Sequence, residues 1–235
     1  MSDTELTAYT IDRISAQRAF TMAEQLHYLH RRPVRPTDSF GLFDPRGNVV
    51  GFLTFGRPPS ASVQRGVCGP DESPHVVELT RLWVSDTVPK NGESFFIGGV
   101  LTRLRTERSP LDIVVSYSDT AYGHRGIVYQ ATNFLYTGRS KKMSDPMPTT
   151  TKFASSAGKT TSLRNWYRKH IGDPTGVSLF DLMSARFGKG NVRWVERSRK
   201  NRYVMFNGWN RQRRSEARSK LRWGILPYPK ETETT

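Results

Sequence analysis

The sequence predicts an α+β fold in which a mixed central sheet is flanked by helices and followed by a basic C-terminal extension. Two apolar runs surround Asp-Pro-Arg-Gly-Asn, which predicts a hairpin of 39–44 with 48–56. The run 75–85 alternates imperfectly, as expected for a central strand covered on both faces. A helix over 93–107 separates it from the apolar strand 111–119. This order favours a parallel pair with a right-handed crossover.

The remaining elements of this part follow from periodicity and turn composition. The segment 14–30 has apolar residues at steps of three and four and ends at Arg-Arg-Pro, which predicts a helix. The segment 57–74 is rich in Pro, Gly and Ser and is predicted to be a loop. After the second parallel strand, 127–134 has helical character and 135–140 is predicted to be a short strand.

The C-terminal part carries fewer signals. Residues 139–175 lack periodicity apart from a short helix near 161–170, and we interpret this stretch as an insertion or linker. Residues 178–188 are predicted to form a helix, 201–207 a strand, and 210–222 a very basic helix.

Composition limits the class of protein. With 36% apolar and 11% aromatic residues the chain is expected to fold, and Cys68 is its only cysteine, which excludes an intrachain disulfide and a multi-cysteine zinc site. No apolar run approaches the ~18 residues needed to cross a bilayer, and the N-terminal segment is too acidic and polar for a signal peptide. We expect a cytoplasmic protein with no membrane association.

The net charge of +15 is confined to one part of the chain. Residues 1–138 hold 14 basic and 14 acidic residues, whereas 139–235 hold 22 basic and 7 acidic residues. Such a bias predicts a polyanionic partner, with a solubilising surface or an anionic-membrane patch as the alternatives. We therefore distinguish a core, 1–138, from a basic, aromatic-rich part, 139–235, that binds DNA and completes the same domain.

Aromatic residues interleaved with arginines strengthen the case for nucleic acid, because they add base stacking to phosphate contact. They are Trp194, Tyr203, Phe206, Trp209 and Trp223. The basic side chains predicted to contact double-stranded DNA are Arg199, Lys200, Arg202, Arg211, Arg213, Arg214, Arg218 and Lys220.

The order of elements resembles that of GNAT-type N-acetyltransferases, and VYQATNFLYTG resembles their tyrosine-containing helix. The resemblance implies that two parallel strands separate and that the helix between them receives the pantetheine and pyrophosphate of coenzyme A. Acetyl-CoA or a related acyl donor is the implied cofactor, with candidate residues at Lys90, Asn91, Gly92 and Ser94. This loop lacks the glycines of the GNAT pattern and adds Glu93, which argues against ordinary coenzyme A binding.

Five segments also resemble the phage Mom DNA-modification family, known from bacteriophage Mu and its homologues. They are VELTRLWVSDTVPKNGES, SYSD, GHRGIVYQATNF, NRYVMFN and PYPK, which cover roughly 75–138 and 199–230. The resemblance implies a GNAT-like enzyme that converts the exocyclic amine of adenine in DNA to a carbamoylmethyl (acetamido-type) derivative. Such an enzyme acts in the cytoplasm of the infected bacterium and shields phage DNA from restriction.

The same resemblance implies functional roles for His27, Tyr28, Arg81, Asp119 and Tyr129. The adenine amine is a poor nucleophile, so a carboxylate such as Asp119, which follows an apolar strand, is expected to accept its proton. Tyr129 is expected to be the general acid for the leaving group. The alternatives are a helix N-cap for Asp119, a core role for Tyr129 and a buried ion pair for Arg81.

A metal site is a weaker prediction. His27 and His30 are three residues apart on the expected helix, and with Asp119 or Glu78 they would form a two-His-one-carboxylate iron site. Five scattered histidines make this spacing a coincidence more often than a site. Glu78 and Arg81 are three apart on one strand and are expected to lie on opposite faces.

Two other classes of function stay open at this point. One is a non-catalytic DNA-binding or packaging protein on a degenerate acyltransferase fold, which the altered loop supports. The other is a small-amine acetyltransferase, against which the charge argues. The sequence leaves the group donor, the target DNA sequence and the oligomeric state undetermined.

Overall fold

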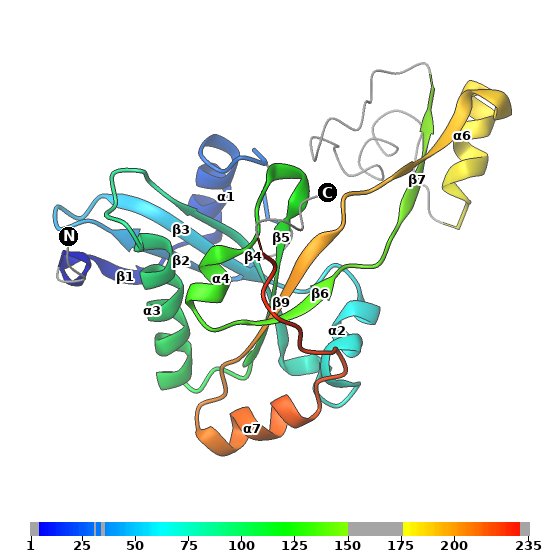
Figure 1. Ribbon diagram of the computed structural model, residues 1–235. Coiled ribbons are helices and arrows are strands. Elements are labelled where there is room, and N and C mark those ends of the chain that lie inside the picture. Colours follow the sequence, from blue (N-terminus) through cyan, green and yellow to red (C-terminus); the bar gives the residue numbers. More distant parts are fainter. Residues whose placement is uncertain (1–4, 31, 34–35, 150–175, 231–235) are drawn as a thin grey trace. The chain divides into compact units, whose positions relative to one another are not determined.

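The computed structural model describes residues 5–30, 32–33, 36–149 and 176–230. Seven strands form the main sheet, in the order β1-β2-β3-β4-β5-β9-β6. They are β1 (Thr10–Arg13), β2 (Pro36–Phe43), β3 (Val49–Gly56), β4 (Val76–Val84), β5 (Ile113–Asp119), β9 (Lys200–Phe206) and β6 (Leu135–Arg139). Strands β1 to β4 pair antiparallel and β4 pairs parallel with β5 (Figure 1), so the sheet is mixed.

The helices of the described residues are α1 (Ala16–Gln25), α2 (Ala61–Cys68), α3 (Gly92–Thr106), α4 (Ile127–Ala131), α6 (Leu179–Phe187) and α7 (Arg211–Ser219). Short 3-10 turns occupy Leu6–Ala8, Ser73–His75, Thr120–Tyr122 and Lys189–Asn191. The predicted α+β class, a mixed central sheet flanked by helices, is confirmed.

The chain forms two compact units. The first comprises the described parts of 1–117, 126–138 and 202–230, and the second comprises those of 118–125 and 139–201. The basic half of the sequence is therefore divided, because most of β9 and all of α7 belong to the first unit.

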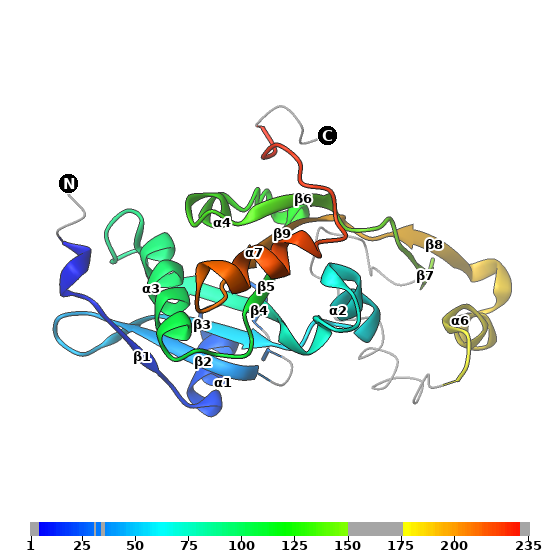
Figure 2. The same cartoon turned by 90° about the horizontal axis from the view of Figure 1, so that it is seen from below.

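The core of the first unit lies on both faces of its sheet. On one face Phe96 and Val100 of α3 and Tyr129 of α4 pack with Val114 of β5. Figure 2 shows α3 and α4 on the opposite side of the sheet from α1. On the other, α2 and α7 pack on β4, β5 and β9, and α1 packs on β3. A fully buried side chain such as Phe96 stabilises the fold by about 1.5–3 kcal/mol. Covering both faces explains the near-continuous apolar run of β5.

The predicted hairpin is confirmed, and its turn chemistry is that of the sequence motif. The Asp44 carboxylate accepts hydrogen bonds from the backbone amides of Arg46 and Asn48, at 2.9 and 2.8 Å. Gly47 has φ of 80°, a conformation that a glycine adopts without strain. The predicted parallel pair is also confirmed, with α3 as its crossover.

Two predictions for the first unit are wrong. The helix predicted over 14–30 ends at Gln25, so the residues that follow are not helical. The segment 57–74 is not a loop, because Ala61–Cys68 form α2. Ser60 caps this helix by accepting a hydrogen bond from the Val63 amide at 3.2 Å. The Pro, Gly and Ser composition hid a capped helix that ends at a glycine.

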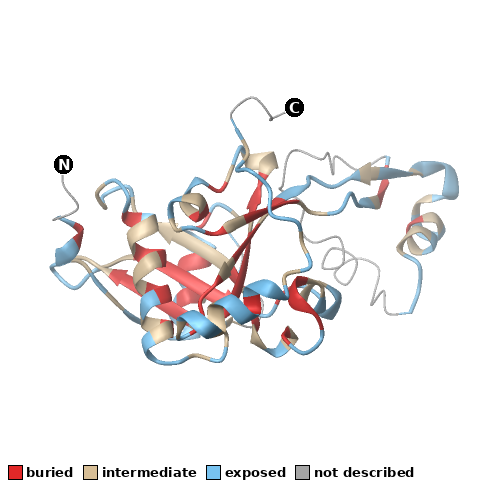
Figure 3. Cartoon of the chain, turned by 60° about the horizontal axis from the view of Figure 1, so that its bottom comes forward, coloured by how far each residue is buried: buried red, intermediate tan, exposed pale blue. Residues whose placement is uncertain are grey.

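The second unit contains a short antiparallel pair, β7 (Ser144–Pro148) with β8 (Val192–Glu196), and helix α6. Met147 of β7 packs with the buried Met183 of α6. In Figure 3 these elements are mostly exposed or intermediate, whereas the strands of the main sheet are mostly buried. The interpretation of 139–175 as an insertion or linker missed β7, and the helix predicted at 161–170 lies outside the described residues.

Candidate functional site

Strands β4 and β5 are paired over only part of their length. The parallel register runs from Val76 with Ile113 to Leu79 with Ser116, although β4 continues to Val84. At the last rung the Ser116 hydroxyl donates to the Leu79 carbonyl at 3.3 Å. Backbone groups of both strands beyond this point lack a parallel partner, and such groups are available to a ligand.

A β-bulge stands at the same place on β4. Thr54 of β3 is opposite Arg81 and Phe55 is opposite Leu79, so Thr80 is the extra residue. The Thr80 hydroxyl donates to the Thr54 carbonyl at 3.1 Å. Bulges often occur beside active sites, where they redirect side chains.

The bulge overturns the expectation that Glu78 and Arg81 lie on opposite faces. Their partners on β3 are Gly56 and Thr54, two residues apart, so both side chains lie on one face of the sheet. Arg81 also donates from Nη1 to the Thr80 carbonyl at 2.6 Å. The alternation argument failed because one inserted residue reverses the face of every residue beyond it.

Tyr129 lies beneath the opening between β4 and β5, where it is 8% exposed. Its ring contacts those of Phe134 and Tyr203, with centroids 5.5 and 5.3 Å away. Burial raises the pKa of Tyr129 to about 12, a hydrogen bond with Ser116 acts in the opposite direction, and Tyr28 and Glu78 raise the pKa further. The phenol is therefore protonated at neutral pH and can donate a proton.

The turn before α4 fixes where Tyr129 points. Gly126 has φ of 77°, and a Cβ at this position would lie 2.5 Å from Cε2 of Tyr203. Gly123 also has a positive φ, of 72°. Both glycines serve the turn, as the sequence predicts, and Gly126 is also required by the close approach of Tyr203.

His27 and Tyr28 follow helix α1 instead of lying on it. His27 is 4% exposed, its ring is stacked on Tyr28 with centroids 4.4 Å apart, and its Nδ1 accepts a hydrogen bond from the Leu29 amide at 3.1 Å. A neutral His27 therefore carries its proton on Nε2. The electrostatic influence of Tyr28 on Tyr129 brings these two predicted residues into one region.

The described residues do not fit the predicted iron site. His30 lies beyond the helix with φ of 46°, and its Nδ1 is 3.0 Å from the Glu24 carbonyl. No group of three His, Cys, Asp or Glu side chains among the described residues is arranged to hold a metal ion. The spacing argument failed because it assumed that the helix extends through His27 and His30.

Asp119 ends β5 within the second unit and is 7% exposed. Its Oδ1 accepts hydrogen bonds from the Ala121 amide and the Ser198 hydroxyl, both at 3.1 Å, and its Oδ2 lies 3.5 Å from Nζ of Lys200. The structure therefore shows the capping role that was the alternative for this residue. Its role as a proton acceptor stays a prediction.

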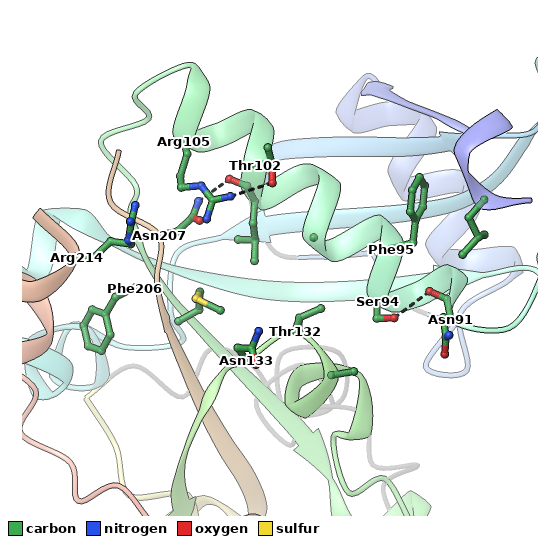
Figure 4. Close-up of a pocket in the computed structure, with 15 residues that line it drawn as sticks. Asn91, Ser94, Phe95, Thr102, Arg105, Thr132, Asn133, Phe206, Asn207 and Arg214 are labelled. Carbon is green, nitrogen blue, oxygen red and sulfur yellow. Dashed lines mark hydrogen bonds between the residues drawn. The ribbon is translucent and has the colours of Figure 1, made fainter. Parts of the chain in front are cut away.

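A groove of about 760 Å³ runs along α3 (Figure 4). Of the residues predicted to bind a cofactor, Asn91 and Ser94 line it, whereas Lys90 and Gly92 are not among its lining residues. Asn91 precedes the helix with φ of 70°, and Ser94 donates to the Asn91 carbonyl at 2.9 Å. A Cβ on Gly92 would lie 2.4 Å from Cγ1 of Val88, so this glycine serves packing.

The side chains predicted to contact DNA differ in the number of hydrogen bonds and ion pairs that they already make within the protein. Arg213 donates to Asp112 and Glu72, and Lys220 also donates to Glu72. Arg202 donates to Thr137 and is stacked on Trp223 with 3.7 Å between the guanidinium carbon and the ring centroid, and burial lowers its pKa. Each of these three has a structural role.

Of the others on this list, Arg199 and Lys200 are exposed and Arg214 is half-buried. Arg199 donates to the Ser140 carbonyl, Lys200 pairs with Asp119, and Arg214 donates to the Gly208 carbonyl. Arg211 and Arg218 are exposed on α7, and their side chains make no hydrogen bond or ion pair with the part of the chain that the structure describes.

Sequence reasoning missed two contributors. Ser116 is fully buried and holds Tyr129, and its signal was a polar residue directly after the apolar run 113–115. Arg105 lines the groove from the last turn of α3, and only the folding of α3 beside α4 and β9 reveals it.

Comparison with known proteins gives a match to one protein family, to a relative of that family and to several solved structures. The model of the Mom protein family matches residues 8–230. The chain belongs to the Mom protein family. A relative of this Mom-family chain, named methylcarbamoylase mom, from Escherichia phage Mu, is 31% identical over 128 residues. The aligned region covers 54% of this chain and 53% of that protein, so the match spans about half of the relative.

Among solved structures, the matches to this Mom-family chain include acetyltransferases. The putative acetyltransferase yncA of Salmonella typhimurium, with its cofactor acetyl-CoA, is 14% identical with a TM-score of 0.42, covering 87% of this chain and 95% of that one. The ribosomal-protein-S5-alanine acetyltransferase of Vibrio fischeri is 8% identical with a TM-score of 0.43, covering 86% and 96%. No helix in the described ranges is long and apolar enough to span a membrane.

Proposed function

We propose that this chain is a phage DNA-modification enzyme that converts the exocyclic amine of adenine in DNA to a carbamoylmethyl derivative and so protects phage DNA from restriction. Family membership and the name of the Mu relative support the type of reaction. The observation that carries the proposal is the protonated, buried phenol of Tyr129 at the opening between β4 and β5.

The proposed chemistry assigns a task to each group. The adenine nitrogen forms a bond to the donated carbon, and the bond from that carbon to the leaving group breaks. The leaving group takes a proton from Tyr129, whose hydroxyl is held by Ser116. The amine loses its proton to a carboxylate, for which we propose Asp119. His27 and Tyr28 form the stacked pair near Tyr129, and Arg81 supplies a positive charge at the bulge.

The donor proposed for this reaction is an acyl compound related to acetyl-CoA, which would supply when bound a methylene that carries both the leaving group and a carboxamide. Acetyl-CoA itself would give an N-acetyl product, because its electrophilic carbon is the thioester carbonyl and it has no amide nitrogen. Asn91 and Ser94, which line the groove, would hold it. Glu93 in the first turn of α3 is unfavourable to a pyrophosphate at this helix end. We therefore expect calorimetry with acetyl-CoA to give weak binding. An affinity near micromolar, about −8 kcal/mol, would contradict this expectation.

Double-stranded DNA is the proposed partner. The exposed Arg211 and Arg218 on α7 are suited to phosphate contact, which positions a protein without reading sequence. Because the adenine amine is paired in the duplex, the enzyme must unpair or flip the base before it reacts. The exposed Trp194 and Trp209 are candidates for stacking on bases.

A second function has one observation in its favour. Asp119 is engaged as a cap, with a hydroxyl and an ammonium as further partners. A non-catalytic DNA-binding protein on a degenerate acyltransferase fold would keep such a structural carboxylate and would need no proton acceptor.

Mass spectrometry of nucleosides from DNA of cells that express the protein tests the proposal. The wild type should give a carbamoylmethyl adduct of adenine, and Tyr129→Phe should reduce it by ~10²-fold or more at a near-normal melting temperature. Tyr203→Phe is the matched control, since it also removes one buried phenol from the same core, and it should keep the activity.

The outcomes separate the alternatives. Absence of any adduct with the folded wild type would favour the binding-only function. An adduct of wild-type amount with Tyr129→Phe would show that Tyr129 is a core residue and that the catalytic assignment is wrong.

A further inference from the structure

Residues 221–230 follow α7 as an irregular segment that has no task in the proposed reaction. Figure 1 shows it in red, passing β9 and β6. The Arg222 amide donates to the Val67 carbonyl of α2 at 2.8 Å, and the Leu226 amide donates to the Tyr136 carbonyl of β6 at 2.9 Å. Because β6 is the last strand of the main sheet, the segment covers part of an otherwise open edge.

Burial explains the position of the start of this segment but not that of its end. Trp223 packs against the buried cluster that α2 and α7 cover. Ile225, Leu226 and Tyr228 are exposed, at 49, 50 and 40%. The end of the segment is held instead by a side-chain hydrogen bond, in which the Tyr228 hydroxyl donates to the Phe134 carbonyl at 2.9 Å.

The sequence around Tyr228 prepares it for this contact. Pro227 and Pro229 flank it, and a proline fixes its own φ near about −65° and restricts the residue before it to extended backbone. Leu226 and Tyr228 each precede a proline, so this stretch has little backbone freedom to lose when it is ordered. A proline also has no amide hydrogen to donate to an edge strand, which makes the Tyr228 hydroxyl the more important attachment.

The acceptor of this hydrogen bond belongs to the turn that ends α4. The Phe134 amide donates to the Tyr129 carbonyl at 2.9 Å. The Asn133 amide donates to the Gln130 carbonyl at 3.0 Å, and Asn133 has φ of 61°. These two bonds around a left-handed residue form a Schellman motif, in which the residue after the left-handed one also packs against the last turn of the helix.

Tyr129 and Tyr228 are therefore both bonded to Phe134. The Phe134 amide donates to Tyr129 and the Phe134 carbonyl accepts from Tyr228. The Phe134 side chain is fully buried, and its ring contacts that of Tyr129 with centroids 5.5 Å apart. A displacement of Phe134 would move the backbone and the ring of Tyr129 together, and a misplacement of about 1 Å can cost ~10²-fold in rate.

We propose that Tyr228 is a positioning residue for Tyr129: its hydroxyl fixes the turn after α4 through the Phe134 carbonyl and so holds the Tyr129 phenol at the opening between β4 and β5. Tyr228 does not touch the reacting atoms in this arrangement. The inference rests on the proposed function for one point, namely that Tyr129 donates a proton to the leaving group.

Amide hydrogen exchange on the full chain tests the structural link without any measurement of activity. Tyr228→Phe keeps the ring and removes only the hydroxyl, so exchange of the Phe134 amide should accelerate about tenfold, the effect of losing one hydrogen bond to the turn. Ile225→Ala is the matched control, because it shortens an exposed side chain of the same segment, and it should leave the Phe134 rate unchanged. Melting temperatures confirm that both variants are folded.

Adduct formation at saturating DNA, followed by mass spectrometry, tests the effect on the chemistry. Tyr228→Phe should lower the rate about tenfold at unchanged affinity for duplex DNA, and Ile225→Ala should keep the wild-type rate. In the Tyr129→Phe background, Tyr228→Phe should have no further effect, because the phenol that it positions is already absent. A residue that only stabilises the fold would lower the rate in both backgrounds.

Three results would overturn the inference. The first is exchange of the Phe134 amide that Tyr228→Phe leaves unchanged. The second is an equal loss of adduct when Tyr228→Phe is made with and without Tyr129→Phe. The third is a loss of duplex-DNA affinity in Tyr228→Phe with the rate at saturating DNA unchanged, which would make Tyr228 a DNA contact.

The two experiments also separate this inference from the proposed function. Faster exchange at Phe134 in Tyr228→Phe, together with no adenine adduct from the wild type, would refute the proposed function and leave the structural link in place. An adduct that requires Tyr129 but forms at the wild-type rate in Tyr228→Phe would refute the positioning role alone.

Discussion

Replacement of Arg213 by Gln is expected to destabilise the protein before it affects DNA binding. The guanidinium donates to Asp112 at 2.7 and 2.9 Å and to Glu72 at 2.7 Å. The side chains of Glu72 and Asp112 are 5% and 6% exposed. Breaking such a pair from one side leaves buried carboxylates without their main partner, which typically costs about 3–5 kcal/mol.

The pKa of Glu72 gives a second, independent magnitude for the stabilisation by this ion pair, and it also predicts how that stabilisation depends on pH. Hydrogen bonding to Arg213 is the largest cause that lowers this pKa from 4.5 to about 2, against the effect of burial and with help from Lys220. The difference corresponds to about 3 kcal/mol of unfolding free energy. Because the folded pKa is the lower one, this stabilisation is present above pH 4.5 and is lost as the pH falls towards 2.

Urea denaturation of wild type and Arg213→Gln at pH 7 and at pH 3 measures both effects. The variant should lose about 3 kcal/mol or more at pH 7, and the difference from wild type should narrow at pH 3. Arg211→Gln and Arg218→Gln, which replace exposed arginines of the same helix, should stay within about 0.5 kcal/mol of wild type. If Arg213→Gln unfolds at the wild-type urea concentration but loses DNA affinity, Arg213 contacts phosphate and the structural argument is refuted.

Three further predictions concern the site, the turn and the basic surface. Asp119→Asn should cut adduct formation by ~10²-fold while DNA affinity hardly changes, and undiminished adduct by mass spectrometry would leave this residue with its capping role alone. Gly126→Ala should lower the melting temperature more than Gly123→Ala, because both glycines have positive φ but only Gly126 lies against the Tyr203 ring. Equal effects of the two substitutions would mean that the close approach of Gly126 to Tyr203 is unimportant. DNA affinity should fall by about 10³ or more between 50 and 200 mM salt, and Arg211→Gln with Arg218→Gln should weaken binding to all sequences alike. A flat salt response would contradict a phosphate-based interface.

Local chemistry determined much of the fold from the sequence alone. The Asp44 turn, the crossover helix α3 and the parallel strand β5 were predictable because each depends on residues adjacent in the chain. The position of Tyr129 after a glycine turn was predictable for the same reason. The concentration of positive charge in 139–235 can also be read from the sequence without the structure.

The tertiary structure decided which side chains meet. Thr80 is an extra residue only in relation to β3, and that pairing puts Glu78 and Arg81 on one face although alternation predicts opposite faces. Arg213 is neutralised by Asp112 and Glu72, which are 101 and 141 residues away in the chain. Periodicity and composition describe a residue by its near neighbours, whereas strand register and ion pairing are set by distant segments. The sequence therefore determined that the protein is basic, and only the fold decided which of its arginines remain available to a ligand.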